Sequence, residues 1–239
     1  MANLAQLRML ENLNGVVLVD KPAGLSFSTV AKTVKRKFNL VKLGIGCSLD
    51  AMASGLVPLL VNDANRHVGA VMGADRRYEG TMRLGVRTDT HDVHGKPSAP
   101  AVEASPAAAV IAAAAAEFRG DIFQTESRWC SVRRDGSAAY EIADTGEHAP
   151  FLAHVYAFTP GEASGGRLPF TLFCTKGVIP RTLVNDFGEA LGCGACLESL
   201  RRTAVGRLRV EDAIPFERLL ETEIGDFPQC VLPTGTVLQ

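Results

Sequence analysis

The stretch GIGCSLDAMASGLVPLLV, which runs from Gly44 to Val61, joins a loop of small residues to a continuous apolar run. The apolar part, from Gly55 to Val61, predicts a buried strand. The loop before it carries a single carboxylate, Asp50. Considered alone, Asp50 fits a helix N-cap, a ligand or a reactive carboxylate, and the loop does not decide among them.

The whole chain has the composition of an ordinary globular protein. It has 239 residues, of which 46% are hydrophobic and 21% are charged, and its net charge is -1. This length suits one large domain, or one domain with a modest appendage. The balanced charge points to no particular class of partner, although local basic patches remain informative.

The N-terminal segment MANLAQLRMLENLNG has no long apolar core and carries Arg8 and Glu11. It matches neither a secretory signal nor a membrane-spanning segment. The 6 cysteines are scattered along the chain, which without such a signal is typical of reduced thiols. We therefore expect a cytoplasmic protein with no membrane partner.

Hydrophobic spacing predicts an alternation of strands and helices along the chain. The first strand, Val16–Val19, leads through a turn into a helix that Ser28 or Thr29 caps and that ends near Phe38. Further helices are expected at 64–73, 105–118 with Ser105 as N-cap, 137–146, 181–193 and, as a short turn, at the start of 197–213. Further strands are expected at 76–86, 153–160, 168–175 and the end of 197–213. This order indicates an α+β protein with a mixed sheet.

Several residues have both a chemical and a structural interpretation. Cys47 would need a base to act as a nucleophile, and no Cys–His pattern is present, so we interpret it as a small buried thiol. The HDVH segment, His91–His94, lies in a polar loop without a second ligand cluster, and we interpret it as solvated rather than metal-binding. Cys193 and Cys196 form one C-x-x-C without a matching second pair, which favours packing.

A basic run occupies the first expected helix. Its cations are Lys32, Lys35, Arg36 and Lys37, with no acid between them. Such a run is either a solvated helix face or a surface that contacts phosphates. The run alone does not decide between these two interpretations.

Five segments in order carry a resemblance to a known family. They are NGVVLVDKPAGLS (14–26), SLDAMASGLVPLLVNDANR (48–66), DRRYEGTMRLGVRTDTHDVHG (75–95), CSVRRDGSAAYEIADTGE (130–147) and CTKGVIPRTLVNDFGEALGCGACLESLRRTAVG (174–206). The second is similar to the pattern G-T-L-D-P-x-A-x-G-V-L-P, and the last to C-x-K-G-T-Y-I-R…D-L-G…L-x-x-L-R-R-T-x-V-G. Together they resemble the bacterial tRNA pseudouridine-55 synthase (TruB-like) family.

The resemblance implies a fold and a set of site residues. The fold would be α+β, with a pseudouridine-synthase-like, mixed and largely antiparallel sheet flanked by helices. Asp50 falls on the family's catalytic aspartate, Tyr78 on the tyrosine that stacks against the target base, and Arg181 on the arginine that pairs with the aspartate. Residues expected to contact RNA are Lys21, Lys32, Lys35, Arg36, Lys37, Lys176, Arg201 and Arg202. No metal and no cofactor is implied.

The resemblance also implies a function and a division of the chain. We expect an N-terminal extension at 1–13, a catalytic domain at 14–213 and a short tail at 214–239 without a full PUA domain. The implied reaction converts a uridine to pseudouridine, at position 55 of the tRNA T-loop. The partner would be tRNA or another structured RNA, and the protein is expected to be a monomer.

Three of the positions that depart from the family pattern keep an alternative open. Ile45 stands where the family has a histidine, and Ile179 stands where it has a second tyrosine. Pro180 fixes φ and removes an N–H one residue before Arg181. The alternative is a non-catalytic RNA-binding or tRNA-chaperone paralogue, or a synthase with a changed RNA target.

Overall fold

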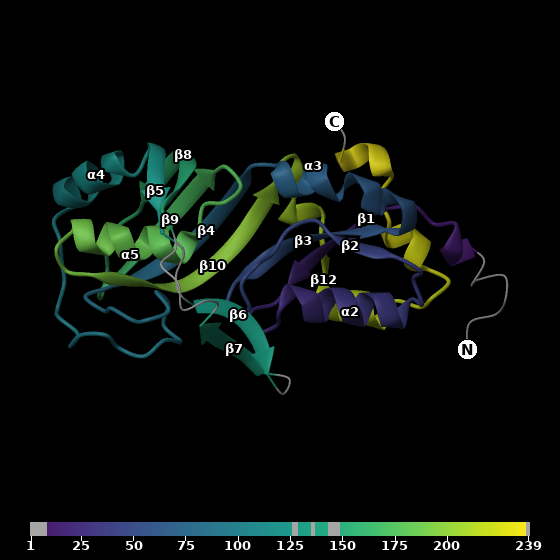
Figure 1. Cartoon of the computed structure of the whole chain (residues 1–239), viewed down its shortest axis with the longest axis horizontal. Coiled ribbons are helices and arrows are strands. Elements are labelled where there is room, and N and C mark those ends of the chain that lie inside the picture. The colour runs from purple at the N-terminus through teal and green to yellow at the C-terminus, as the bar shows by residue number, and fades with distance from the viewer. Residues whose placement is uncertain (1–8, 126–128, 135–136, 143–148, 238–239) are drawn as a thin grey trace. The chain divides into compact units, whose positions relative to one another are not determined.

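The chain forms two compact units in the computed structural model, which describes residues 9–125, 129–134, 137–142 and 149–237. Unit 1 contains Met1–Ala74 and Arg202–Gln239, and unit 2 contains Asp75–Arg201. Figure 1 labels the elements of both units.

Unit 1 is built on three antiparallel strands. β1 (Gly15–Lys21) pairs with β3 (Ser54–Val61), and β2 (Leu43–Ile45) pairs with the far end of β3. The register places Lys21, the last residue of β1, opposite Gly55 at the start of β3. The loop that carries Asp50 therefore leaves β2 and enters β3 beside the end of β1.

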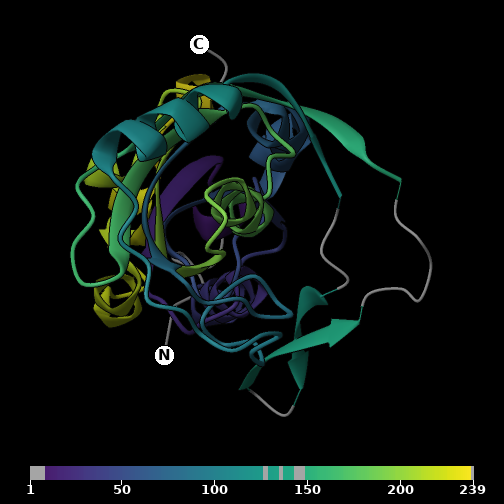
Figure 2. The same cartoon turned by 90° about the vertical axis from the view of Figure 1, so that its left-hand side faces the viewer.

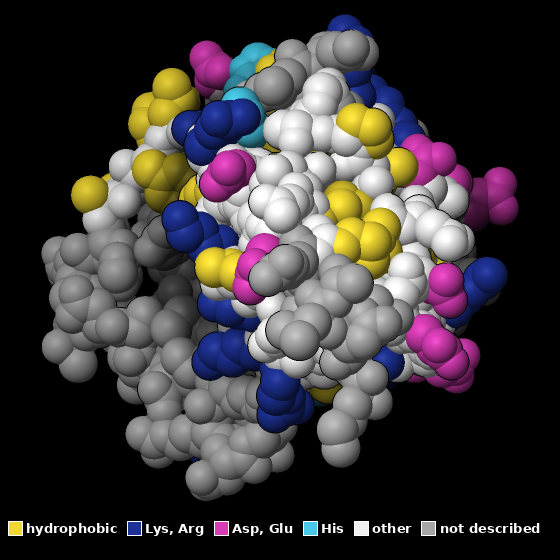
Figure 3. All heavy atoms as spheres, turned by 90° about the vertical axis from the view of Figure 1, so that its right-hand side faces the viewer, with side chains coloured by type: hydrophobic (Ala, Val, Ile, Leu, Met, Phe, Trp, Pro, Cys, Tyr) yellow, Lys and Arg dark blue, Asp and Glu magenta, His cyan; other side chains and the backbone are white. Residues whose placement is uncertain are grey.

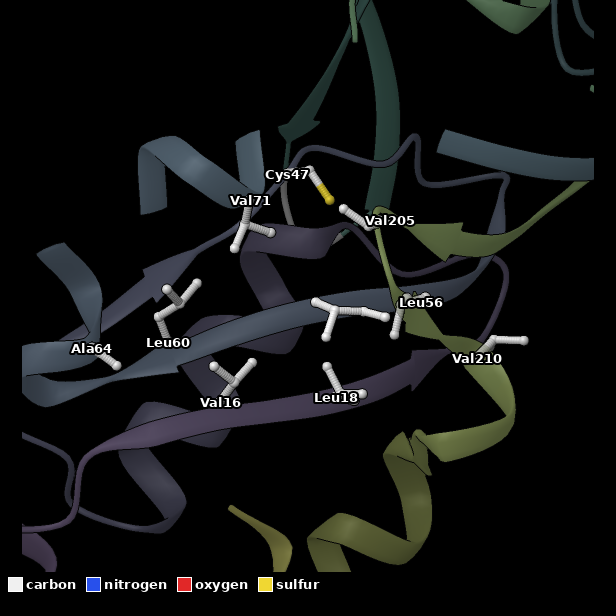
Figure 4. Packing of buried hydrophobic residues seen from close by; sticks show 10 residues of the cluster. Val16, Leu18, Cys47, Leu56, Leu60, Ala64, Val71, Val205 and Val210 are labelled. Atoms are coloured by element: carbon white, nitrogen blue, oxygen red, sulfur yellow. The ribbon is translucent and has the colours of Figure 1, made fainter. Parts of the chain in front are cut away.

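Helices and short strands complete unit 1. They are α2 (Phe27–Lys37), η1 (Asn62–His67), α3 (Val68–Gly73), β11 (Leu208–Arg209), η2 (Val210–Asp212), β12 (Ile214–Pro215), α6 (Phe216–Glu221), η3 (Phe227–Cys230) and η4 (Thr234–Val237). The core between them is apolar, and Figure 4 shows Leu18, Leu56, Val71 and Val205 pointing into it. Cys47 lies in the same cluster at 2% exposure, which confirms it as a buried thiol.

The segment 214–239, expected as a tail, is part of the unit 1 core where it is described. β12 pairs in parallel with β1, and Val16 and Leu232 exchange backbone hydrogen bonds of 2.9 and 2.8 Å. Phe227 is fully buried and stacks on Phe38 at the end of α2, with ring centroids 3.9 Å apart. The end of the chain thus closes the apolar space between β1 and α2.

Unit 2 contains four antiparallel strands in the order β4 (Arg76–Leu84), β9 (Arg167–Cys174), β8 (Phe151–Pro160) and β5 (Gly120–Gln124). Two helices pack on one face, α4 (Ala108–Glu117) and α5 (Pro180–Ala190), and Figure 2 shows α5 nearly end-on. Phe158 of β8 contacts Phe187 of α5 and Phe118 at the end of α4. A separate pair, β6 (Trp129–Arg134) and β7 (Ser137–Ile142), forms a two-stranded sheet.

The expected α+β class is confirmed, with helices on a mostly antiparallel sheet, but four local expectations were wrong. The cap of α2 is Ser26, whose Oγ accepts from the N–H of Thr29 at 3.1 Å. The helix α4 begins at Ala108, after an Ala107 cap that makes no side-chain bond, so Ser105 lies outside it.

In the other two cases we expected a helix and the structure has a strand. Residues 137–142 form β7, because pairing with β6 satisfies the backbone of a six-residue segment whose spacing is ambiguous; the rest of that expected helix, to Gly146, lies outside the described residues. Residues 195–205 form the long strand β10 (Ala195–Val205), because neighbouring strands provide partners that outweigh helix propensity.

We predict that Phe227→Ala lowers the free energy of unfolding by about 3 to 5 kcal/mol, since it removes a fully buried ring. The matched control is Phe123→Ala, because Phe123 is 73% exposed and its loss should cost less than about 0.5 kcal/mol. Urea unfolding of both variants measures the difference. Equal, small effects would show that 214–239 is not part of the core.

Candidate catalytic site

The loop that carries Asp50 makes a tight turn and enters a strand directly. The N–H of Ala53 donates to the carbonyl of Asp50 at 3.1 Å, and β3 begins at Ser54. No helix starts at Asp50, so the N-cap interpretation is excluded. Asp50 itself is half-buried and has interacting partners.

The ammonium of Lys21 holds this loop from one side. The side chain is fully buried, and Nζ donates to the carbonyl oxygens of Ala51 at 3.3 Å and Ala53 at 2.5 Å. It also donates to Pro22 at 2.9 Å and Leu25 at 2.7 Å, in the turn that follows β1. Lys21 thus joins the turn after β1 to the turn that contains Asp50, and it has no surface from which to contact a phosphate.

The guanidinium of Arg202 holds the same loop from the other side. Arg202 lies on β10 and is fully buried. Its Nε donates to the carbonyl of Leu56 at 2.9 Å, and its Nη1 donates to the carbonyl of Ser48 at 2.5 Å. The expected contact of Arg202 with RNA therefore conflicts with its burial.

Glycines in and around the loop allow close packing of the protein against itself. A Cβ on Gly44 would lie 2.0 Å from the side-chain oxygen of Asn65, and a Cβ on Gly46 would lie 2.5 Å from Val71. Gly55 has φ of +104°, and a Cβ there would lie 2.3 Å from the carbonyl oxygen of Arg202. These positions require glycine because η1, α3 and β10 pack against them; Gly44 and Gly46 are buried and leave no space for an RNA backbone.

Burial changes the acid–base behaviour of Lys21. Its pKa is lowered to about 8, chiefly by burial and further by the charge of Arg202, while the carboxylate of Asp50 acts in the opposite direction. Unit 1 therefore places two cations and one carboxylate within electrostatic range of one another.

In unit 2, Tyr78 lies on the strand face that the helices cover. It belongs to β4, pairs with Leu172 of β9 and is 6% exposed. The strand expected at 76–86 is confirmed, and Met82 and Leu84 are buried on it at even spacing from Tyr78. Tyr78 has interacting partners within the protein.

Arg181 lies in the first turn of α5 and is held by a polar loop of the same unit. Its Nη1 donates to the carbonyl of Thr90 at 2.8 Å. Within that loop, the carboxylate of Asp92 accepts from the hydroxyl of Thr90 and from the N–H of His94, both at 2.9 Å. The loop is also joined to β10, because the N–H of Leu197 donates to the carbonyl of His91 at 2.9 Å. The Thr-Asp-Thr segment thus positions Arg181.

The interpretation of His91–His94 as a solvated loop is wrong for Asp92, which is buried, and no role was expected for Gln124; both residues hold candidate site segments. Asp92 is fully buried, and its place in a Thr-Asp-Thr-His-Asp run was a usable signal. Gln124 accepts from the N–H of Ile179 at 2.9 Å and donates to its carbonyl at 3.3 Å, just before α5. A single glutamine at the end of a strand carries no such signal in the sequence.

Ile179 and Pro180, which depart from the family pattern, fit the local backbone. Pro180 is the first residue of α5, where the missing N–H would have no helical partner in any case. The carbonyl of Ile179 still accepts from the N–H of Leu183 at 3.0 Å. Pro180 therefore favours the start of the helix that carries Arg181. Ile45 lies on β2 opposite Leu59 and is half-buried.

The remaining basic residues differ in exposure. Lys32, Lys35 and Arg36 are exposed on α2, whereas Lys37 is half-buried with its ammonium 5.5 Å from the centre of the Phe38 ring. Lys176 is exposed in the turn before α5, and Arg201 is half-buried with partners of its own. Lys and Arg side chains gather down one side of the face shown in Figure 3.

The described residues contain no group of three or more His, Cys, Asp or Glu side chains placed to hold a metal ion. Burial raises the pKa of Cys174 to about 12 and that of Cys196 to about 11, so both remain thiols near neutral pH. In the same described ranges, no helix is long and apolar enough to cross a membrane.

Comparison with known proteins identifies the family. Residues 35–179 match the model "TruB family pseudouridylate synthase (N terminal domain)", and residues 181–239 match "tRNA pseudouridylate synthase B C-terminal domain". The tRNA pseudouridine synthase B of Burkholderia pseudomallei (strain 668) is 40% identical over 87% of this chain and 69% of its own length. The enzyme of the same name from Escherichia coli O1:K1 / APEC is 37% identical over 88% of this chain and 68% of its own length. The chain belongs to the TruB family of pseudouridylate synthases.

Solved structures confirm the fold. A chain in "Crystal Structure of a Cbf5-Nop10-Gar1 Complex" matches with a TM-score of 0.75 and 24% identity, over 97% of this chain. A chain in "Structure of H/ACA RNP bound to a substrate RNA containing 2'-deoxyuridine" matches with a TM-score of 0.72 and 23% identity. The present chain spans 63% and 62% of these two chains.

The Lys21 pKa predicts a specific dependence of stability on pH. The folded protein releases this proton near pH 8 and the unfolded chain near 10.5, so raising the pH through this window stabilises the fold. Relative to Lys21→Met, the free energy of unfolding of the wild type should rise by up to about 3 kcal/mol across the window. Urea unfolding of both proteins at a series of pH values measures it. A difference that is flat or falls with pH would contradict the burial of a charged Lys21.

Proposed function

We propose that this member of the RNA pseudouridine synthases isomerises the T-loop uridine at tRNA position 55. Family membership places the chain in the isomerase class that converts uridine to pseudouridine in RNA. The observation that carries the proposal for this chain is the loop geometry of unit 1: two buried cations hold the main-chain carbonyls of Ser48 and Ala51, on either side of Asp50.

The proposed reaction is an isomerisation that needs no co-reactant. The bond between N1 and C1′ breaks, the base turns, and a new bond forms between C5 and C1′. C5 loses its proton and N1 gains one, so atoms and charge balance. The carboxylate of Asp50 either attacks C1′ or removes the C2′ proton, and in both cases it must be held at a fixed place relative to the ribose.

The other two proposed catalytic residues come from unit 2. We assign Tyr78 to stacking on the turned base and to removal of the C5 proton, because a base taken out of its stack needs an aromatic surface. We assign Arg181 to pairing with the carboxylate of Asp50, for which a guanidinium is well suited. The anchoring of Arg181 on Thr90 keeps one of its N–H groups occupied and its orientation fixed.

The proposed partner is tRNA, recognised through its folded T-arm and its phosphates. Lys32, Lys35 and Arg36 are exposed on α2 and free of acids in sequence, which supports phosphate contacts there. Lys37, Lys176 and Arg201 remain further candidates for RNA contact. We also propose a cytoplasmic monomer, with the catalytic domain at 14–213 between the segments 1–13 and 214–239.

We predict that Asp50→Asn abolishes product formation while RNA affinity stays within about twofold of wild type, since the amide keeps the shape but cannot act as nucleophile or base. The measurement is single-turnover tritium release from C5-labelled, unmodified tRNA transcripts, with filter binding for affinity. Release by the wild type alone supports the proposal. If the wild type binds RNA but releases no tritium, the chaperone alternative suggested by Ile45 and Ile179 replaces it.

The basic face of α2 gives a separate prediction. Lys35→Glu with Arg36→Glu should weaken tRNA binding at least about tenfold at low salt and reduce the slope of log affinity against log salt concentration, because phosphate contacts are lost. The matched control is Arg207→Glu with Arg209→Glu, which makes the same charge change at two exposed positions. Arg207 lies in the turn between β10 and β11, and Arg209 lies in β11. Equal losses for the two double variants would assign the effect to net charge rather than to α2.

A further inference from the structure

Arg202, like Lys21, departs from its expected role because it is fully buried. The resemblance groups it with the RNA contacts, but its side chain is fully buried in unit 1. Two of its donors are used on main-chain carbonyls, those of Ser48 and Leu56. These carbonyls lie on either side of Asp50 in the chain, so the planar guanidinium fixes both ends of the segment that presents the carboxylate.

The third guanidinium nitrogen, Nη2, indicates that the buried arginine does more than stabilise the fold. Nη2 of Arg202 is buried and has no hydrogen-bond partner among the described residues. An unsatisfied buried donor costs about 1 to 3 kcal/mol. Apolar side chains of similar volume often replace buried charges without loss of stability. A buried arginine whose Nη2 group has no acceptor is therefore a costly way to fill the core beside this loop.

The geometry points to Arg202 as a positioning residue for the reaction: it fixes the Asp50 carboxylate relative to C1′ of the target nucleotide and does not contact RNA. This inference rests on the proposed function for its catalytic part. Lys21 holds two carbonyls that follow Asp50, those of Ala51 and Ala53. Arg202 holds one carbonyl before Asp50 and one further along, in β3. Between them the two cations leave the turn little freedom.

Lysine cannot replace Arg202 in this role. The guanidinium presents Nε and Nη1 in a rigid plane and so reaches two carbonyls at once, whereas an ammonium is a single point on a flexible stem. Arg202→Lys keeps the charge and loses the simultaneous hold on Ser48 and Leu56. The matched control is Arg209→Lys, because Arg209 also donates to main-chain carbonyls, those of Gly206 and Leu208, but lies exposed away from the Asp50 loop.

The experiment compares full-length wild type, Arg202→Lys and Arg209→Lys by single-turnover tritium release at saturating protein, and by tRNA binding. We expect Arg202→Lys to slow the chemical step about 100-fold with affinity within about twofold, since small misplacements of a reacting group have such effects. Arg209→Lys should match the wild type. A weaker affinity for tRNA with an unchanged saturating rate would overturn the inference and restore Arg202 as an RNA contact. An unchanged rate and affinity with lower stability would make it purely structural.

A second variant tests the electrostatic interaction between Arg202 and Lys21. Arg202→Gln removes the charge that lowers the pKa of Lys21, and the groups that act on Lys21 by charge are Arg202 on β10 and Asp50 in the loop. The pH at which the folded protein releases the Lys21 proton should therefore rise in Arg202→Gln, so the pH window over which the free energy of unfolding rises should start at a higher pH than in the wild type. A window that starts at the same pH in both proteins would contradict the coupling.

Hydrogen exchange separates failure of this inference from failure of the proposed function. If the wild type releases no tritium, the proposed function fails, and deuterium uptake by peptides covering 44–56 still tests the positioning. Faster uptake there in Arg202→Lys, with the rest of unit 1 unchanged, supports the hold on the loop. Equal uptake in wild type and variant would overturn it.

Discussion

Two buried cations determine the conformation of the turn that carries Asp50. Removing an ammonium and a guanidinium from water is costly, and the structure offsets that cost with main-chain carbonyls rather than with a matched set of carboxylates. Lys21 donates to four carbonyls and Arg202 to two, all within unit 1. Because these acceptors lie on the turn after β1, on the Asp50 loop and on β3, the three segments are fixed to one another through the two side chains.

The surrounding packing in unit 1 follows from this constraint. Gly55 has to be glycine because β10 passes close enough for Arg202 to reach back to the loop. The apolar cluster that includes Leu56 and Val205 keeps β3 and the end of β10 in place, and it excludes the water that would compete for the carbonyls. In unit 2 a buried charged side chain also fixes a loop: the carboxylate of Asp92 shapes the loop that holds Arg181. The positions of Asp50 and Arg181 therefore both depend on hydrogen bonds to main-chain carbonyls.

The sequence was most informative where local pattern and tertiary structure agree. The apolar runs of β1 and β3, the alternation of β4 and the spacing of α5 were all visible, and the order of motifs was enough to indicate the family. The sequence misled for β7 and β10, where pairing with neighbouring strands outweighs helix propensity. The residues of a strand do not reveal which strand it pairs with. Burial of charge was also hidden: Lys21 and Arg202 are indistinguishable in sequence from surface cations, and only the path of β10 past Gly55 removes Arg202 from solvent.

We propose that this chain converts one uridine of the tRNA T-loop to pseudouridine. The most direct measurement is to incubate the purified full-length protein with a mixture of unmodified tRNA transcripts and to map pseudouridine at single-nucleotide resolution. We expect pseudouridine at position 55 and at no other uridine. Pseudouridine at a different position would contradict the assigned target, and its absence from every transcript would contradict catalysis itself.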